Sequence, residues 1–74
     1  MNISNALVIR LNELMQKEGI SVDRLSQISG VSVTAIKDIR SGKTKTTGID
    51  TIYRIARGLD ISLRDFFDSD YFDE

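Results

Sequence analysis

The chain has 74 residues, the length of one small domain. It contains no cysteine and no histidine, which excludes disulfides, thiolate metal sites and the commonest general base. The net charge of −1 is unevenly spread: residues 1–57 hold nine Lys and Arg against five acidic residues, whereas residues 58–74 hold one Arg against six. A basic body with an acidic end can bind a polyanion while the whole chain stays near neutral.

The composition is that of an ordinary globular domain, with 41% hydrophobic and 28% charged residues. Proline is absent, which favours helix throughout. No apolar run approaches the ~20 residues that span a bilayer, and the first residues carry no signal-peptide pattern. We therefore expect a cytoplasmic protein with no membrane contact.

The first predicted helix covers residues 5–18, with Ser4 as its N-cap and Gly19 ending it. Its apolar positions recur at helical spacing and share one face: Leu7, Val8, Leu11, Leu14 and Met15. Ile9 falls on the opposite side, either as a single exposed apolar residue or as a partner contact.

Two short helices follow, over residues 21–29 and 32–41. Ser21 and Ser32 stand at the N-cap positions, and Gly30 and Gly42 follow the last helical residues. The residues expected to face inward are Leu25, Ile28, Ala35, Ile36 and Ile39. Three or four residues with a glycine join the two helices, which is the spacing of a helix-turn-helix; a plain helical bundle is the alternative.

A polar loop, "KTKTTG", leads to a fourth helix over residues 49–58. Its expected inward residues are Ile49, Ile52, Ile55, Ala56 and Leu59. Asp60 can take the left-handed conformation at the helix exit, and Ser62 with Asp65 forms an acidic relative of the capping box for a fifth helix. The final "DSDYFDE" is expected to be an acidic, frayed tail.

The chain resembles the phage-repressor and Cro-like (XRE-type) helix-turn-helix family over residues 5–68. The matching features are "GIS", "LS", "GVS", Ile36 and Ile39, Gly42, and "IYRIARGLDIS". The resemblance implies an all-α, compact five-helix lambda-repressor-like domain (residues 1–68) followed by an acidic tail (69–74). It also implies binding to palindromic double-stranded operator DNA, usually as a two-fold homodimer.

The base-reading positions of the family fall on Val33, Thr34, Lys37 and Asp38. The helix pattern agrees, because Ile36 and Ile39 leave these residues exposed. Lys37 can donate to guanine, Asp38 can accept from cytosine, and Val33 and the Thr34 methyl can contact thymine methyls. The alternatives are that Asp38 is a surface acid that discourages loose phosphate binding and that Val33 packs under the preceding helix.

Phosphate contacts are expected from helix ends and from the loop after residue 41. The candidate residues are Ser21, Ser32, Arg40, Lys43, Thr44, Lys45 and Thr46. The loop residues could instead form an ordinary solvated basic loop. Arg40 could instead be a surface residue whose stem covers Met15.

Three departures from the family pattern stand out. Val22 occupies the position where the family often has a glutamine that contacts phosphate. Met15 and Arg40 occupy the positions of a frequent arginine–glutamate pair, so both partners are changed and no buried charge is left unpaired. The recognition helix also lacks long amide side chains, which predicts a reliance on thymine methyls and DNA shape.

These features predict a sequence-specific transcriptional regulator, acting as a repressor. The alternative is an antitoxin-like or other protein-interaction module that uses the acidic tail. Tyr71 and Phe72 in the tail are either a homodimer contact or disordered. We expect no enzyme activity, since no carboxylate pair lies in an apolar setting, and no cofactor, metal or small-molecule ligand. DNA binding would place the protein at the nucleoid.

Overall fold

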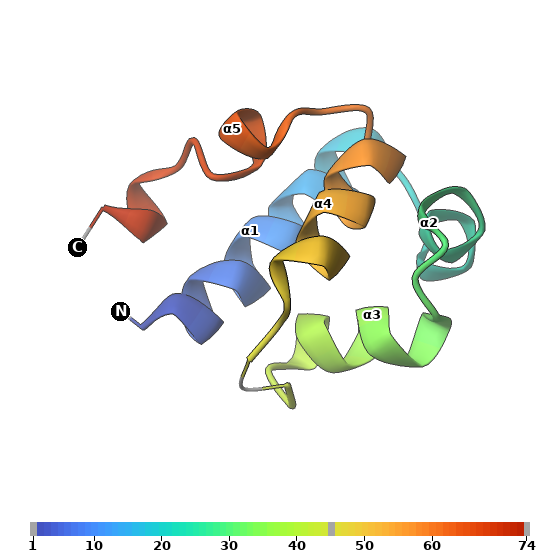
Figure 1. The fold of residues 1–74 in the computed structure, drawn as a ribbon, viewed down its shortest axis with the longest axis horizontal. Coiled ribbons are helices and arrows are strands. Elements are labelled where there is room, and N and C mark those ends of the chain that lie inside the picture. Colours follow the sequence, from blue (N-terminus) through green and yellow to red (C-terminus); the bar gives the residue numbers. More distant parts are fainter. Residues whose placement is uncertain (1, 45, 74) are drawn as a thin grey trace.

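The computed structural model describes residues 2–44 and 46–73 of the chain. Its helices are α1 (Ile3–Glu18), α2 (Val22–Ser29), α3 (Val33–Ser41), α4 (Ile49–Gly58) and α5 (Leu63–Phe66), followed by a short 3-10 helix, η1 (Asp70–Phe72) (Figure 1). The described residues contain no strand. The prediction of an all-α domain with five helices is confirmed. Within these residues, no helix has the length and apolarity that crossing a membrane requires.

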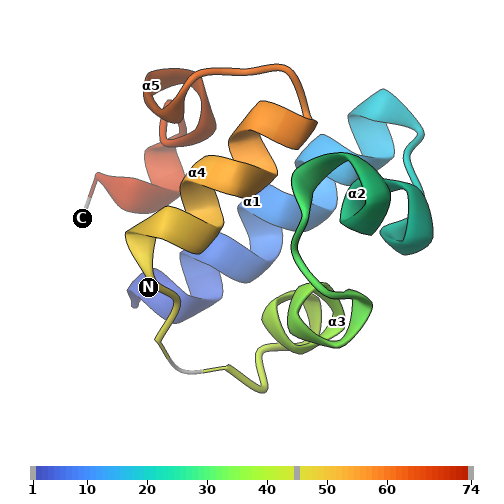
Figure 2. The ribbon, with the colours of Figure 1, turned by 45° about the vertical axis from the view of Figure 1, so that its right-hand side comes forward.

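The helices pack around one core. The helix α3 packs on α1, and α2 packs on both α3 and α4. The helices α2 and α3 lie at one side of the molecule, while α5, η1 and both termini lie at the other (Figures 1 and 2). The ends of the chain are therefore remote from the α2–α3 pair.

The core draws large side chains from every α-helix. The most completely buried are Phe66, Leu11, Met15, Leu25, Ile36 and Ile55. Burial of each such side chain contributes roughly 1.5–3 kcal/mol relative to leaving it in water. Ile9 is half-buried rather than exposed, so the covered surface of α1 extends beyond its predicted apolar face.

Two predicted core residues are on the surface instead. Ile28 and Ile49 are both exposed. Ile28 lies in the last turn of the two-turn helix α2, where Leu25 is the buried residue. Ile49 is the first residue of α4, one turn before Ile52, where the buried positions of that helix begin. A period of 3.6 residues is thus correct for both helices, but it does not indicate where along each axis the packing contact ends.

Most predicted helix ends are correct, with one exception in α1. The Oγ atoms of Ser21, Ser32 and Ser62 each accept the backbone N–H three residues on, as N-caps do. Asp60 has φ +61°, the left-handed conformation expected for it. Ser4 is not a cap: it lies inside α1, which begins two residues earlier than the predicted start because Asn2 supplies the capping oxygen.

The C-terminal segment is folded up to residue 73, so the prediction of a frayed tail is wrong there. The Tyr71 hydroxyl donates to Glu13 Oε2 at 2.7 Å, and the Phe72 ring packs edge-on against Phe67 at a centroid distance of 5.0 Å. These contacts attach the tail to its own domain, so the alternative that Tyr71 and Phe72 are disordered is wrong. Arg10 of α1 adds to this attachment by donating to the backbone oxygens of residues 65 and 66.

Candidate nucleic-acid interface

The turn between α2 and α3 is built by four consecutive residues. Gly30 ends α2 with φ +77°, a conformation that glycine adopts without strain, and its N–H bonds to the Ser26 oxygen at 3.0 Å. The Ser29 hydroxyl then accepts the N–H of Val31, whose side chain is buried in the core. Ser32 starts the next helix. The turn is therefore fixed by hydrogen bonds on both sides and by one buried side chain.

The helix α3 has a buried side and an outward side. Ile36 and Ile39 are buried, and Ala35 packs partly buried against the core. Among the four predicted base-reading residues, Thr34 and Lys37 are exposed, while Val33 and Asp38 are half-buried. Their spacing along α3 places all four on the side of the helix that the two isoleucines leave free. The helix lies at the edge of the molecule, where a long ligand can reach it (Figure 1).

The C-terminal end of α3 is bonded to α1 through Asn12. The Arg40 Nε donates to Asn12 Oδ1 at 2.6 Å, and Asn12 Nδ2 donates in turn to the backbone oxygens of Arg40 (3.3 Å) and Val8 (2.9 Å). All these groups are partly buried, so they lose water and keep their hydrogen bonds. With Nε engaged, a phosphate contact by Arg40 would come from the terminal nitrogens of its guanidinium group.

The loop after α3 begins in an ordered way. The backbone oxygen of Asp38 accepts from the Lys43 N–H (3.0 Å), the Thr44 N–H (3.3 Å) and the Ser41 hydroxyl (3.3 Å). The side chains of Lys43 and Thr46 are exposed, and that of Thr44 is half-buried. Lys45, the remaining candidate in this loop, lies outside the described residues. The start of the loop therefore holds one exposed cation directly beyond the end of α3.

The two capping serines, Ser21 and Ser32, are exposed at the N-termini of α2 and α3. Each hydroxyl oxygen accepts one backbone N–H and keeps its own O–H, which can donate to a phosphate. The positive end of each helix dipole favours an anion at the same place. Val22, which stands where the family often has a glutamine, is half-buried and packs against the core instead of reaching outward.

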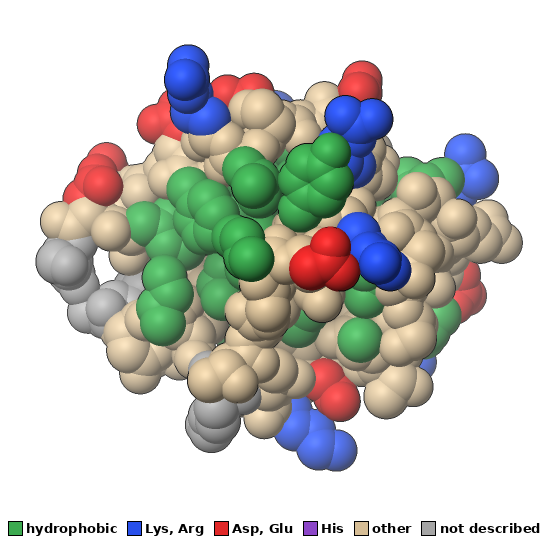
Figure 3. Space-filling view, viewed as in Figure 1, with side chains coloured by type: hydrophobic (Ala, Val, Ile, Leu, Met, Phe, Trp, Pro, Cys, Tyr) green, Lys and Arg blue, Asp and Glu red, His purple; other side chains and the backbone are tan. Residues whose placement is uncertain are grey.

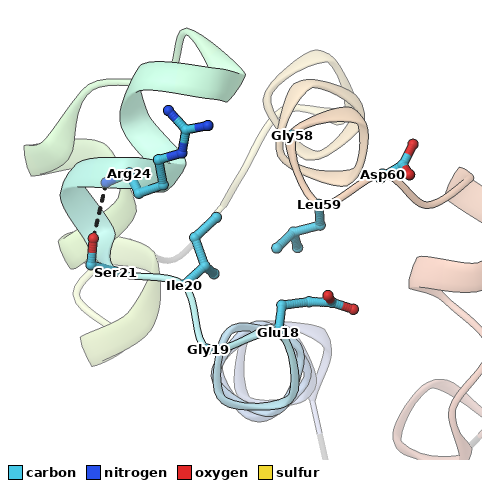
Figure 4. Close-up of a pocket in the computed structure, with 8 residues that line it drawn as sticks. All are labelled: Glu18, Gly19, Ile20, Ser21, Arg24, Gly58, Leu59 and Asp60. Atoms are coloured by element: carbon cyan, nitrogen blue, oxygen red, sulfur yellow. Dashed lines mark hydrogen bonds between the residues drawn. The ribbon is translucent and has the colours of Figure 1, made fainter.

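A cleft of about 480 Å³ lies where the start of α2 meets the end of α4 (Figure 4). Its charged side chains are of both signs: Glu18, Arg24 and Asp60. In Figure 4 the guanidinium of Arg24 points away from the Glu18 carboxylate, so the three groups do not converge on one point. A cleft of mixed charge without converging groups adds nothing to an anion-binding surface, and the candidate interface stays on α3, its loop and the two serine caps.

The comparison with known protein families decides what this arrangement is. The family model for Cro/C1-type HTH DNA-binding domains matches residues 10–70. The chain belongs to the Cro/C1-type helix-turn-helix family. No curated protein and no solved structure gave a match to it. The matched residues of this helix-turn-helix domain include α2, α3 and the loop between α3 and α4.

Membership of the family makes the protein a DNA-binding regulator and confirms the resemblance drawn from the sequence. Within the helix-turn-helix domain, Gly58 fixes how closely α4 approaches α2. A Cβ atom added to Gly58 would lie 3.0 Å from Ser29 Cβ and 3.2 Å from Leu25 Cδ1. A side chain there would press on α2 more tightly than most Cβ contacts allow, so the glycine permits this close approach of α4 to α2.

Sequence reasoning missed two residues that join α1 to other elements, one of them to the helix-turn-helix. Asn12 joins α1 to the end of α3, and Arg10 joins α1 to the end of α5. Both lie beside the apolar face of α1, and both are half-buried. A polar residue at the edge of an apolar helix face can bond to a neighbouring helix. This position beside the apolar face is the sequence feature that could have identified Asn12 and Arg10.

Proposed function

We propose that this Cro/C1-type domain is a sequence-specific transcriptional repressor that reads an operator through the major groove with residues 32–41. The observation that carries the proposal is the division of α3: Ile36 and Ile39 are buried, while Thr34 and Lys37 on the other side are exposed. A helix of this kind can enter the groove without disturbing the core. Repression follows from occupancy, since a bound domain of 33 × 23 × 21 Å excludes other proteins from the same DNA.

In this proposal the outward residues of α3 have distinct roles. Lys37 donates to guanine, and the methyl groups of Thr34 and Val33 contact thymine. Asp38, half-buried on the same side, accepts from cytosine. Few of these groups form two hydrogen bonds to one base, so a substantial part of the specificity comes from the shape and deformability of the DNA.

The phosphate contacts come from residues around α3. The proposed set is Ser21, Ser32, Arg40, Lys43, Thr44, Lys45 and Thr46. Such contacts set the position of the protein on the duplex and carry no sequence information. Each neutralised phosphate adds about 0.9 to the magnitude of the slope of log K against log salt concentration.

We further propose that the domain binds a palindromic operator as a homodimer. A single α3 reads only a few base pairs, whereas two copies related by a two-fold axis read half-sites one helical turn apart. The alternative of a tail-mediated protein-interaction module has no such support. The aromatic side chains of the tail are engaged with Glu13 and Phe67 of the same domain.

In-vitro selection from random duplex DNA tests the proposal. We expect enrichment of a two-fold symmetric sequence; enrichment of no sequence would refute specific readout. The Lys37→Ala variant should change the preferred base at one position of each half-site. The matched Lys43→Ala variant should weaken all sequences alike and reduce the salt slope by about 0.9 per half-site. Equal effects of both variants on base preference would contradict the division between readers and phosphate contacts.

A further inference from the structure

The side of the domain formed by α4 and the start of α1 exposes large apolar side chains. Ile49 is 62% exposed, Ile3 is 60% exposed and Tyr53 is 47% exposed. Figure 3 shows hydrophobic side chains gathered over α4, with acidic and basic side chains beside them. We call this surface, made of these three residues with Asp50 and Arg54, the α4 face. Large exposed apolar side chains that gather on one side of a small domain are typical of an interaction site.

A groove runs beside the α4 face. It has a volume of about 250 Å³, and its apolar lining is supplied by Ile3, Leu7, Ile52 and Phe67. Three of these residues come from α1 and α4, and the fourth follows α5, so the groove is held open by separate, packed elements. An opposing surface can therefore contact both the projecting apolar side chains of α4 and the groove beside them.

The charged side chains of the α4 face can pair with those of a second copy of the same face. Asp50 and Arg54 lie one turn apart and pair at 3.2 Å, yet their side chains remain 75% and 55% exposed. A two-fold axis crossing α4 near Thr51 makes two copies of the helix antiparallel. The acidic end of one pair then faces the basic end of the other, and Ile49 faces Tyr53. A surface with exposed apolar side chains beside charges that can pair with those of a second copy fits an isologous contact.

We infer that a second copy of this chain docks on the α4 face, with antiparallel α4 helices, Ile49 against Tyr53 and Asp50 against Arg54. This rests on the proposed function for its role, since it names the surface that would make the operator-binding dimer. It also replaces the tail as the dimer contact. Thr46 and Thr47 line the groove beside the α4 face, so the contact lies next to the loop that follows α3.

The first test is sedimentation velocity of the full chain without DNA. The wild type should form dimers with a micromolar dissociation constant, and Ile49→Asp should raise that constant at least about tenfold. Gln27→Asp is the control: it introduces the same negative charge at an exposed residue of α2, away from the α4 face. It should leave the dimer intact. A wild type that remains monomeric at about 100 µM, or equal loss of the dimer in both variants, would overturn the inference.

The second test uses charge reversal and separates contacts between copies from contacts within one. Asp50→Arg and Arg54→Asp each place like charges opposite one another in a homodimer, so each variant alone should dimerise more weakly. A mixture of the two restores opposite charges across the interface but not within either chain. We expect heterodimers to be favoured over either homodimer by roughly fivefold. A mixture with no such preference would contradict the proposed register.

DNA binding by the same variants distinguishes failure of this inference from failure of the proposed function. Ile49→Asp should still bind a single half-site like the wild type but lose most of its affinity for the full operator. Unchanged affinity for the full operator would overturn the α4 face as the operative dimer contact while leaving the repressor proposal in place. A wild type that dimerises through this face but selects no DNA sequence would refute the function and leave the interface standing.

Discussion

Replacing Gly58 by alanine tests how strongly the packing of α2 against α4 determines the domain. The added methyl group would stand 3.0 Å from Ser29 Cβ, closer than real Cβ atoms ordinarily approach, with Leu25 and Ile28 atoms at 3.2 and 3.3 Å. Overpacking of this kind costs about 1–3 kcal/mol. Alanine also favours helix over glycine by at most about 1 kcal/mol, and by less at the last residue of a helix.

The clash therefore outweighs the helix propensity, and we expect Gly58→Ala to lower the free energy of unfolding by about 1 kcal/mol. For a domain of this size the corresponding fall in Tm is about 4–8 °C. Thermal and urea unfolding, followed by far-ultraviolet circular dichroism, measure both quantities. A Tm equal to or above that of the wild type would refute the reasoning, because propensity alone would then describe the site.

A double-mutant cycle with Ser29→Gly isolates the contact. This second change removes the Cβ atom nearest to the new methyl group, so it should relieve part of the clash. The double variant should lose less stability than the sum of the two single variants, by at least about 0.5 kcal/mol. Simple additivity would mean that the helices move apart without resistance and that Gly58 does not set their distance.

Three further predictions concern other parts of the fold. Gly48 is the N-cap of α4 and makes no side-chain capping bond. Gly48→Ser should therefore raise the free energy of unfolding, measured by urea titration, by a few tenths of a kcal/mol, the usual advantage of a serine N-cap over glycine. Asn12→Ala should cost about 1–3 kcal/mol, measured in the same way, because it removes hydrogen bonds of partly buried groups of α1 and α3. The hydrogen bond to Glu13 raises the pKa of Tyr71 above its ordinary value of 10.0, as do slight burial and the charge of Glu13. In a Tyr53→Phe background, ultraviolet absorbance should show the phenol of Tyr71 titrating above pH 10.0. Glu13→Gln should lower the midpoint of that titration. Since the pKa of Tyr71 is higher in the folded protein, its hydrogen bond to Glu13 stabilises the fold fully below pH 10.0. This stabilisation is lost as the pH rises through the folded-state pKa.

Much of the fold is predictable from the sequence because helix ends are local features. Each capping serine acts on a backbone N–H three residues away, so its role needs no knowledge of the tertiary structure. Asn2 and Ser4 show the limit of this reasoning, since both can cap a helix and only the extent of the packed helix selects between them. The exposed Ile28 and Ile49 show another, because an apolar period indicates which side of a helix is inward but not how far a neighbour covers it.

The candidate site likewise has features that the sequence predicts and features that depend on how the helices pack. The outward position of Thr34 and Lys37 follows from the burial of Ile36 and Ile39, which a helical period alone predicts. The bonds of Asn12 to the end of α3, in contrast, join residues 28 positions apart in the chain. Whether a polar residue at the edge of a helix meets a partner depends on how the helices pack, and no pattern within one sequence contains that information.

The attachment of the C-terminal segment to α1 also has a consequence for synthesis of the protein. Arg10 bonds to backbone atoms 55 and 56 residues further along the chain. At a synthesis rate of about 5–20 residues per second, α1 waits roughly 3–11 s on the ribosome before these partners exist. During that interval the part of α1 that the C-terminal segment covers has no partner. Changes near residues 65–72 should therefore lower the amount of protein in the cell well before they alter its affinity for DNA.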